Sequence, residues 1–567
     1  MRRTSLVVLA TQLLPAVHAQ TPYIMNWSPH FYGPDGPWQA VTIAVGSNNQ
    51  QIALYPGANY ASTILADSIC ANSTLSSTCY AARAGTYNQS ESATSISPDR
   101  NSSSSWNVFY WSVQGGSIQG TIGDEVTLGE TVIPNVSFTT IYDTYQTYPN
   151  GRSYPVSVGN LALGAPRLRQ TSSGLSLNMI AAWLYISNQI PSYSYSMHIG
   201  SVDPPIAGSL VLGGYDRTRL IGQASSQSVV DTAGILQIVL RDIGLGVAEG
   251  GSPFPSFTTS HRGGLFLDDE YQNGGVVLPR LVTIDPTKPY MYLPEATCNA
   301  ITAFFPVSFD TGFGLYIWDT NSADYTTLTS SPTYLSFTFN KGGSTTQNIT
   351  VRVPLQLLTL TLQEPLVEGQ NLTYFPCFLS ADTPVLGRAF LQAAFMGVNW
   401  FEGENNGTWF LGQAPGPTLP GGEDIAPIAV VDTTLRGSEE GSWAESWTRH
   451  WTPLEINDQT SNSNTTDTSD SSGLSTGAKA GIGVGAGISG VILAAVGVYA
   501  TILRRRKQTT KTHEKDTPVI AANTCGQAFT ELPAGNMKGG PMELASKGTT
   551  QPREIMETER VREYELE

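Results

Sequence analysis

Charged residues are scarce in this chain of 567 residues: Asp, Glu, Lys and Arg together make up 13% of it, about half the usual share. Basic residues are the rarer sign, and the formal net charge of -16 argues against a nucleic-acid-binding protein, since phosphates would be repelled. Histidine is also rare, and its six copies are scattered. The sequence therefore predicts no metal site, no Ser–His–Asp triad and no cofactor.

Cysteine is nearly absent, and its five copies fall into two groups. Cys70, Cys79, Cys298 and Cys377 precede residue 400, whereas Cys525 stands alone near the carboxyl end. Four cysteines suit two disulfides in an oxidising compartment, and a lone thiol suits a reducing one. Pairing of neighbours in the sequence would join Cys70 to Cys79 and Cys298 to Cys377.

Two apolar segments predict how the chain meets a membrane. Residues 1–19 have two arginines, an apolar run and then small residues, which is typical of a signal peptide cleaved after Ala19. The segment 480–503 carries no charge and is long enough to cross a bilayer as one helix. Four basic residues, 504–507, follow it directly. We therefore expect a single-pass type I protein with an extracellular or lumenal ectodomain and a cytoplasmic tail, residues 504–567. Small residues in the span permit self-association.

Asn-x-Ser/Thr sequons, the acceptors of N-glycosylation, occur only upstream of the predicted span. They lie at Asn26, Asn72, Asn88, Asn101, Asn135, Asn348, Asn371, Asn406 and Asn464. Their distribution agrees with the predicted topology and with a glycoprotein.

The ectodomain reads as a large, mostly β unit followed by a stalk. Up to residue 415, short apolar or alternating runs are separated by Gly, Pro and Asn, which is typical of strands. The stretches 177–189 and 295–305 are the best helix candidates. Residues 416–479 are rich in Gly, Pro, Ser, Thr and acids, so we expect an extended stalk that buries little apolar surface. Three residues within it, Trp443, Trp447 and Trp451, are candidates to pack back on the domain.

Several segments between residues 35 and 415 resemble, in the same order, the pepsin-like aspartic proteases of family A1. They are DGPWQAVTIAVGSNNQQIALYPGANYASTIL from Asp35, GSIQGTIGDEV from Gly116, VGNLALGAP from Val158, GSLVLGGYDRTRLIG from Gly208, VTIDPTKPYMYLPEATCNAI from Val282 and VLGRAFLQAAFMGVNW from Val385. The resemblance implies a bilobal pepsin-like fold, with residues 20–225 as the first lobe and 226–415 as the second. It also places Cys298 and Cys377 where the family's second lobe is usually bridged.

The same resemblance assigns Asp285 to the second-lobe catalytic aspartate, on a turn facing the cleft. The family's chemistry needs two carboxylates that share one proton, so that one activates water and the other donates to the scissile carbonyl. In the first lobe, alignment on Gly57 puts Tyr55 where the other aspartate is expected. No Asp or Glu occurs from Gly36 to Ala66. A tyrosine, with a reference pKa near 10, is a poor replacement at acidic pH.

Both residues also have a structural interpretation. Asp285 can cap its own turn by accepting hydrogen bonds from backbone amides beyond Pro286, and Lys288 can pair with it and hold it ionised. Tyr55 either contacts a peptide on the cleft floor or fills the space of the lost acid.

Three functions are compatible with this sequence. The first is a catalytically impaired surface protein that binds a peptide or a partner protein in the interlobe cleft. The second is an active membrane-bound aspartic endopeptidase with a rearranged dyad, and the third is a structural surface glycoprotein. We favour the first, because paired acid–base groups fail together when one of them is removed.

Overall fold

The computed structural model describes residues 20–456 except 72–75, 77, 98–103, 111–112, 173, 255–260, 269–278, 401–405, 419–421 and 439–441. The predicted signal peptide (1–19), membrane span (480–503) and cytoplasmic tail (504–567) lie outside these residues. Within the described part of the chain, no helix has the length and apolar character needed to cross a membrane.

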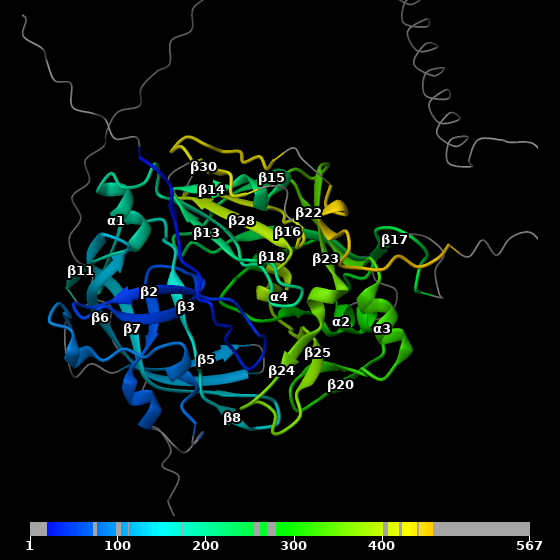
Figure 1. The fold of residues 1–567 in the computed structure, drawn as a ribbon, viewed down its shortest axis with the longest axis horizontal. Coiled ribbons are helices and arrows are strands. Elements are labelled where there is room, and N and C mark those ends of the chain that lie inside the picture. Colours follow the sequence, from blue (N-terminus) through cyan, green and yellow to red (C-terminus); the bar gives the residue numbers. More distant parts are fainter. Residues whose placement is uncertain are drawn as a thin grey trace, which may run out of the picture. The chain divides into compact units, whose positions relative to one another are not determined.

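Strands dominate the described residues, which confirms the prediction of a mostly β protein. The first lobe is built on one large sheet with the strand order β10-β11-β7-β4-β9-β3-β2-β6-β5, and β8 pairs with β7. Its strands, drawn in blue and cyan in Figure 1, are β2 (Val41–Val45), β3 (Gln50–Ala58), β4 (Ser62–Leu65), β5 (Ser104–Tyr110), β6 (Val113–Leu128), β7 (Thr131–Thr147), β8 (Ser153–Tyr154), β9 (Gly159–Ala162), β10 (Arg169–Ser172) and β11 (Leu175–Asn178).

The second lobe has two sheets of its own, with the orders β23-β22-β16-β18-β27-β19-β26 and β20-β21-β25-β24. Its strands are β16 (Gln237–Val247), β17 (His261–Arg262), β18 (Arg280–Ile284), β19 (Met291–Leu293), β20 (Val307–Asp310), β21 (Leu315–Trp318), β22 (Thr333–Asn340), β23 (Asn348–Pro354), β24 (Leu360–Leu362), β25 (Leu372–Phe375), β26 (Cys377–Leu379) and β27 (Val385–Leu386). Strand β17 pairs with β16 at the edge.

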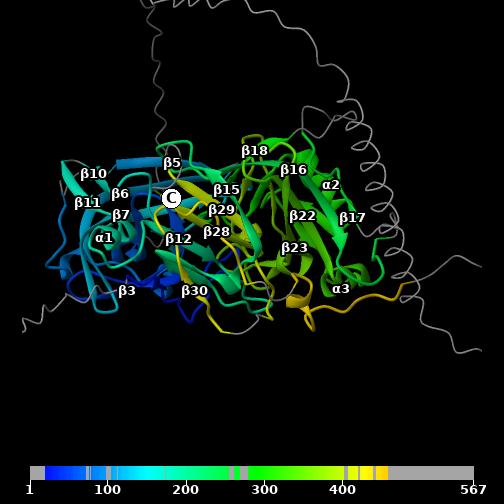
Figure 2. The ribbon, with the colours of Figure 1, turned by 90° about the horizontal axis from the view of Figure 1, so that it is seen from above.

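A six-stranded sheet joins the two lobes, with the order β1-β13-β12-β28-β29-β15. Figures 1 and 2 both show it between the blue first-lobe strands and the green second-lobe strands. It combines strands from both halves of the chain: β1 (Tyr23–Ile24), β12 (Ser194–His198), β13 (Ser209–Leu212), β15 (Ile221–Ser228), β28 (Ala394–Asn399) and β29 (Thr408–Gln413). Strands β28 and β29 are buried along their whole lengths. This sheet therefore connects the two lobes.

The short helices follow the predicted pattern. Helix α1 (Ile180–Ile186) and helix α2 (Glu295–Thr302) fall inside the two candidate stretches. Two more helices are present, α3 (Ala323–Ser330) and α4 (Arg388–Leu391). The two predicted disulfides are confirmed as Cys70–Cys79 and Cys298–Cys377. The second of them ties α2 to β26.

The packed domain extends beyond the boundary expected at residue 415. Residues 422–438 and 442–456, here called the C-terminal strap, lie against the domain instead of forming a stalk. Strand β30 (Ile425–Pro427) of the strap pairs with β14 (Gly214–Asp216), and all three strap tryptophans are buried. The Trp443 ring packs edge-on against Tyr334, and Trp451 Nε1 donates to Glu249. Sparse aromatic anchors outweigh the polar composition of this segment.

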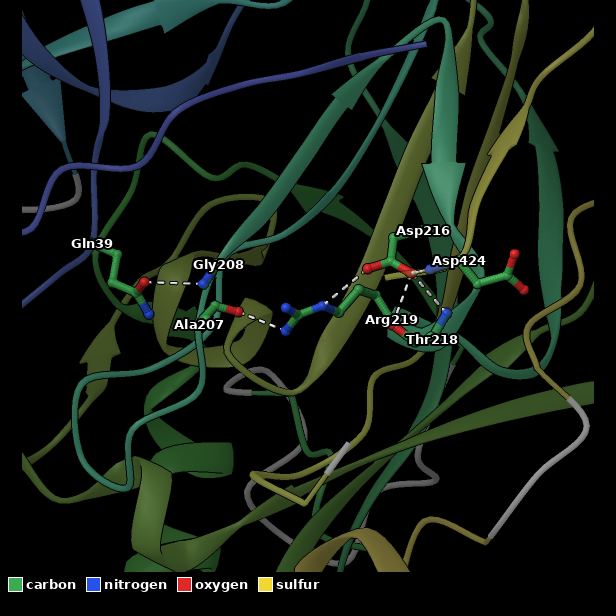
Figure 3. Close-up of polar contacts among 7 residues, drawn as sticks. All are labelled: Gln39, Ala207, Gly208, Asp216, Thr218, Arg219 and Asp424. Atoms are coloured by element: carbon green, nitrogen blue, oxygen red, sulfur yellow. Dashed lines mark hydrogen bonds and ion pairs between the residues drawn. The ribbon is translucent and has the colours of Figure 1, made fainter. Parts of the chain in front are cut away.

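A buried ion pair fixes the strap beside β14 (Figure 3). Asp216 Oδ1 accepts hydrogen bonds from Thr218 N, Thr218 Oγ1 and Asp424 N, and Asp216 Oδ2 lies 3.5 Å from Arg219 Nε. Arg219 Nη1 donates to Ala207 O at 2.6 Å. The amide of the adjacent Gly208 donates to Gln39 Oε1. One carboxylate therefore organises both its own turn and the start of the strap.

Candidate active-site cleft

A cavity of about 530 Å³ opens between the two lobes. Four charged side chains line it, two acids and two bases: Asp35, Asp285, Lys288 and Arg388. Tyrosines make up much of the remaining wall, at positions 55, 145, 148, 195, 290 and 292. The cavity brings Tyr55 and Asp285 together, as the resemblance implied.

Asp285 stands directly after β18, and two backbone contacts fix its position. Its amide donates to Leu386 O at 3.1 Å, and its carbonyl accepts from Lys288 N at 3.1 Å, which closes the turn. Its Oδ1 accepts hydrogen bonds from Thr287 N at 2.9 Å and Thr287 Oγ1 at 2.6 Å. Lys288 Nζ lies 3.8 Å from Oδ2. The side chain thus makes the turn-capping contacts and the ion pair anticipated from the sequence.

Tyr55 lies near the end of β3 in the first lobe and is 6% exposed. Strand β3 runs parallel to β9, with Tyr55 opposite Asn160. The turns of the two lobes then meet at Gly57, which has a φ of +132°; a Cβ there would lie 2.0 Å from Pro286 Cγ. Only glycine allows this approach. The geometry places Tyr55 across from the Asp285 turn.

Arg388 is a second cation that lines the cavity, and it was not predicted as a site residue from the sequence. Together with Tyr55 it forms what is here called the floor of the cavity. It begins α4 and is 5% exposed. Its Nη1 donates to Thr287 O at 2.9 Å and to Pro286 O at 3.2 Å. Its guanidinium carbon lies 4.2 Å from the Tyr55 ring centroid and 5.0 Å from that of Trp38. Such cation–π contacts are strongest where water is excluded. Arg388 therefore connects the second-lobe turn to the aromatic floor of the first lobe.

Asp35 is a second acid in the same cavity, one residue upstream of the segment that lacks Asp and Glu. It accepts a hydrogen bond from Trp38 Nε1 at 3.0 Å. Burial raises the pKa of its carboxyl, and the charge of Arg388 opposes that effect. Within the described residues no hydrogen bond or ion pair joins Asp35 to Asp285. The two acids line one cavity without the direct contact that proton sharing requires.

Buried tyrosines surround Asp35. Its negative charge adds to the effect of burial in raising the pKa of Tyr55, Tyr148, Tyr290, Tyr292 and Tyr374. Tyr148 and Tyr290, from opposite lobes, share a hydrogen bond of 2.9 Å. These phenols stay neutral at any physiological pH, so they serve as donors and ring surfaces rather than as bases.

The chain around Asp35 is hydrogen-bonded to the second lobe. Thr361 N donates to Gly36 O, Gln363 N to Pro34 O and Gln363 Nε2 to Gly33 O, each at 2.9 Å. The phenol of Tyr374 donates to Asp35 O. The segment 33–36 therefore crosses from the first lobe and closes one side of the cavity.

Six of the predicted sequons fall on described residues, and all six are outside the core. Asn26, Asn135, Asn348 and Asn371 are exposed, and Asn88 and Asn406 are partly exposed. Asn72, Asn101 and Asn464 lie outside the described residues.

These features define an aspartic-protease-type domain, with two β lobes, an interlobe cavity and an aspartate on a turn at its floor. A family model for eukaryotic aspartyl proteases matches residues 40–254, which span most of the first lobe and the start of the second. The chain thus carries a domain of the pepsin-like A1 family. A search of curated proteins found no match.

Proposed function

We propose that this protein is a single-pass type I membrane glycoprotein whose A1-type ectodomain has lost endopeptidase activity and binds a peptide or a partner protein in its interlobe cavity. The observation that carries the proposal is the pairing of Tyr55 with Arg388 where the first-lobe acid is expected. A neutral phenol beside a guanidinium cannot share one proton with a carboxylate, so the first-lobe acid of the dyad is missing.

The surviving Asp285 supports the same conclusion. Its Oδ1 accepts two hydrogen bonds from Thr287, and its Oδ2 lies 3.8 Å from the Lys288 ammonium. These local contacts occupy the carboxyl group, and among the described residues no second acid is bonded to it, so the pair of acids that shares one proton is lacking. Asp285 therefore has the position that the resemblance assigns to a catalytic aspartate, but its contacts are those of a residue that caps its own turn.

An active endopeptidase is the second candidate, and Asp35 is the observation that favours it. This acid lines the same cavity as Asp285, and burial raises the pKa of its carboxyl. Hydrolysis would require the cleft to rearrange so that both acids bind one water molecule.

Digestion of a peptide library at acidic pH tests the loss of activity. The full chain purified in detergent is compared with its Asp285→Asn and Asp35→Asn variants, with an active aspartic protease run in parallel. We expect no cleavage by any of the three proteins. Cleavage by the wild type that either variant abolishes would establish the endopeptidase instead.

A matched pair of substitutions tests binding in the cavity. Ile235 lines the cavity and is 42% exposed, whereas Val431 is 73% exposed and is not among the lining residues. We expect Ile235→Trp to obstruct the cavity and weaken capture of peptides or surface proteins, and Val431→Trp to leave capture unchanged. Equal capture by both variants would favour the structural glycoprotein.

A further inference from the structure

Of the charged side chains that line the cavity, only Asp285 and Lys288 form an ion pair within the described residues. Asp285 is compensated by the Lys288 ammonium at 3.8 Å and by the two donors of Thr287. Arg388 has no comparable partner, because no carboxylate in the described part of the chain lies within ion-pair distance of its guanidinium. It is held by two carbonyl oxygens and two aromatic rings. A buried guanidinium ordinarily acquires a counter-charge.

Two buried donors in the same floor also lack acceptors. The Tyr55 hydroxyl and the Arg388 Nε have no hydrogen-bond partner among the described residues. Both side chains are more than nine-tenths buried, and both line the cavity. Leaving buried donors unsatisfied is costly, so such groups commonly mark a place where a ligand or an ion completes the site.

Asp35 does not complete this site. Its carboxyl is engaged by Trp38 Nε1, and burial, which is the largest influence on it, favours its neutral form. Among the described residues Arg388 therefore lacks a direct counter-charge, and an anion would be attracted to its guanidinium.

We infer that the floor of the cleft recognises a carboxylate of a peptide ligand, with Arg388 as counter-charge and Tyr55 as hydrogen-bond donor. The planar guanidinium matches the geometry of a carboxylate, and charge-assisted hydrogen bonds of this type are among the strongest in proteins. The inference rests on the proposed peptide-binding function. The carboxylate belongs either to an acidic side chain or to the free carboxyl end of the peptide, and the experiment separates these two sources.

The test uses the full chain in detergent and three heptapeptide pools that differ only in the carboxylates they carry. One pool is neutral with an amidated end, one is neutral with a free carboxyl end, and one contains Asp and Glu with an amidated end. We expect at least one carboxylate-bearing pool to bind about tenfold or more tightly than the neutral amidated pool. The preferred pool identifies the source of the carboxylate.

Substitutions of Arg388 and Tyr55 test whether the preference for carboxylate-bearing peptides arises at these two residues. Arg388→Gln should remove the preference and retain the weaker binding of the neutral pool, and Arg388→Lys should keep part of the preference. Tyr55→Phe retains the ring and removes the hydroxyl, so it should reduce the preference about two- to fivefold even if the Arg388 variants fold poorly. Lys341→Gln, which removes a cation outside the cavity, is the matched control.

Each outcome has a defined meaning. Equal binding of all three pools by the wild type would overturn the carboxylate inference and leave the peptide-binding function standing. Binding of no pool would overturn the carboxylate inference and the peptide-binding form of the proposed function, and would leave only the partner protein as a ligand. A preference that survives in Tyr55→Phe and Arg388→Gln, both shown to be folded by circular dichroism, would place the carboxylate elsewhere and contradict the assignment.

Discussion

The guanidinium of Arg388 lies over the ring of Tyr55, 4.2 Å from its centroid. The contact joins strand β3 of the first lobe to helix α4 of the second, where the family resemblance would place a pair of acids. A cation and an aromatic ring therefore line the cavity at this position.

If the proposed loss of activity is correct, this contact predicts that an aspartate introduced at position 55 does not create hydrolytic activity. In Tyr55→Asp the new carboxyl would stand beside the Arg388 guanidinium, and a neighbouring cation favours the ionised form of an acid, so the new residue would not hold the proton that a catalytic pair shares. We expect no peptide cleavage between pH 3 and 5, measured with a fluorogenic library. Tyr55→Asn is the isosteric control, and cleavage specific to the aspartate variant would contradict the prediction.

Asp35 predicts an acid-favoured contribution to stability. Burial raises the pKa of its carboxyl in the folded state, so the folded protein binds this proton more tightly than the unfolded chain does. The contribution is therefore present at low pH and is lost as pH rises through the raised value. Asp35→Asn should raise the melting temperature at neutral pH, and the gain should shrink on acidification. A gain of the same size at every pH would show that the carboxyl does not titrate in this range.

His198 predicts the opposite pH dependence. Burial and the nearby Arg219 lower the pKa of its imidazole to about 3, and its Nε2 contacts Gln392 O at 2.9 Å. The unfolded chain takes up this proton near pH 6.5 and the folded protein does not, so stability falls as pH drops from 6.5 toward 3, by up to about 1.4 kcal/mol per pH unit. Denaturant titrations of His198→Gln should show a smaller slope, with His450→Gln as control.

The contacts of the C-terminal strap predict that the stability of a truncated protein depends on whether the strap is retained. An ectodomain that ends at residue 456 keeps the three buried tryptophans and the β14–β30 pairing, whereas one that ends at residue 415 loses both. We expect the shorter form to be insoluble or molten. In the longer form, Trp447→Ala should cost about 3–5 kcal/mol of unfolding free energy. Equal thermal stability of the two truncated forms would contradict this prediction.

The sequence predicts those parts of the fold that depend on local pattern. Strand β2 alternates buried Val41, Ile43 and Val45 with less buried residues, and this period-two pattern is legible without a structure. The contacts of Asp285 with Thr287 and Lys288 were also foreseeable, because these partners lie within three residues of it.

The composition of the cavity floor was harder to predict, because Arg388 lies far along the chain from Asp35 and Tyr55. Asp35 lies directly before the segment that lacks Asp and Glu. Arg388 lies at the start of a short helix, and its local sequence does not distinguish it from any other helix start. Only the tertiary fold brings them together. The strap was expected to be an extended stalk because its average composition is polar, although its three tryptophans, spaced four residues apart, were candidates to pack on the domain and are buried.

The hydrogen bonds between segment 33–36 and residues 361–363 affect how a ligand enters. Swinging the lobes apart at this side would break three backbone carbonyl contacts together, so the cleft resists hinge motion there. On this side the outline of the cavity is therefore set before any ligand binds, and a ligand that fitted there would be selected mainly by its size and its end groups.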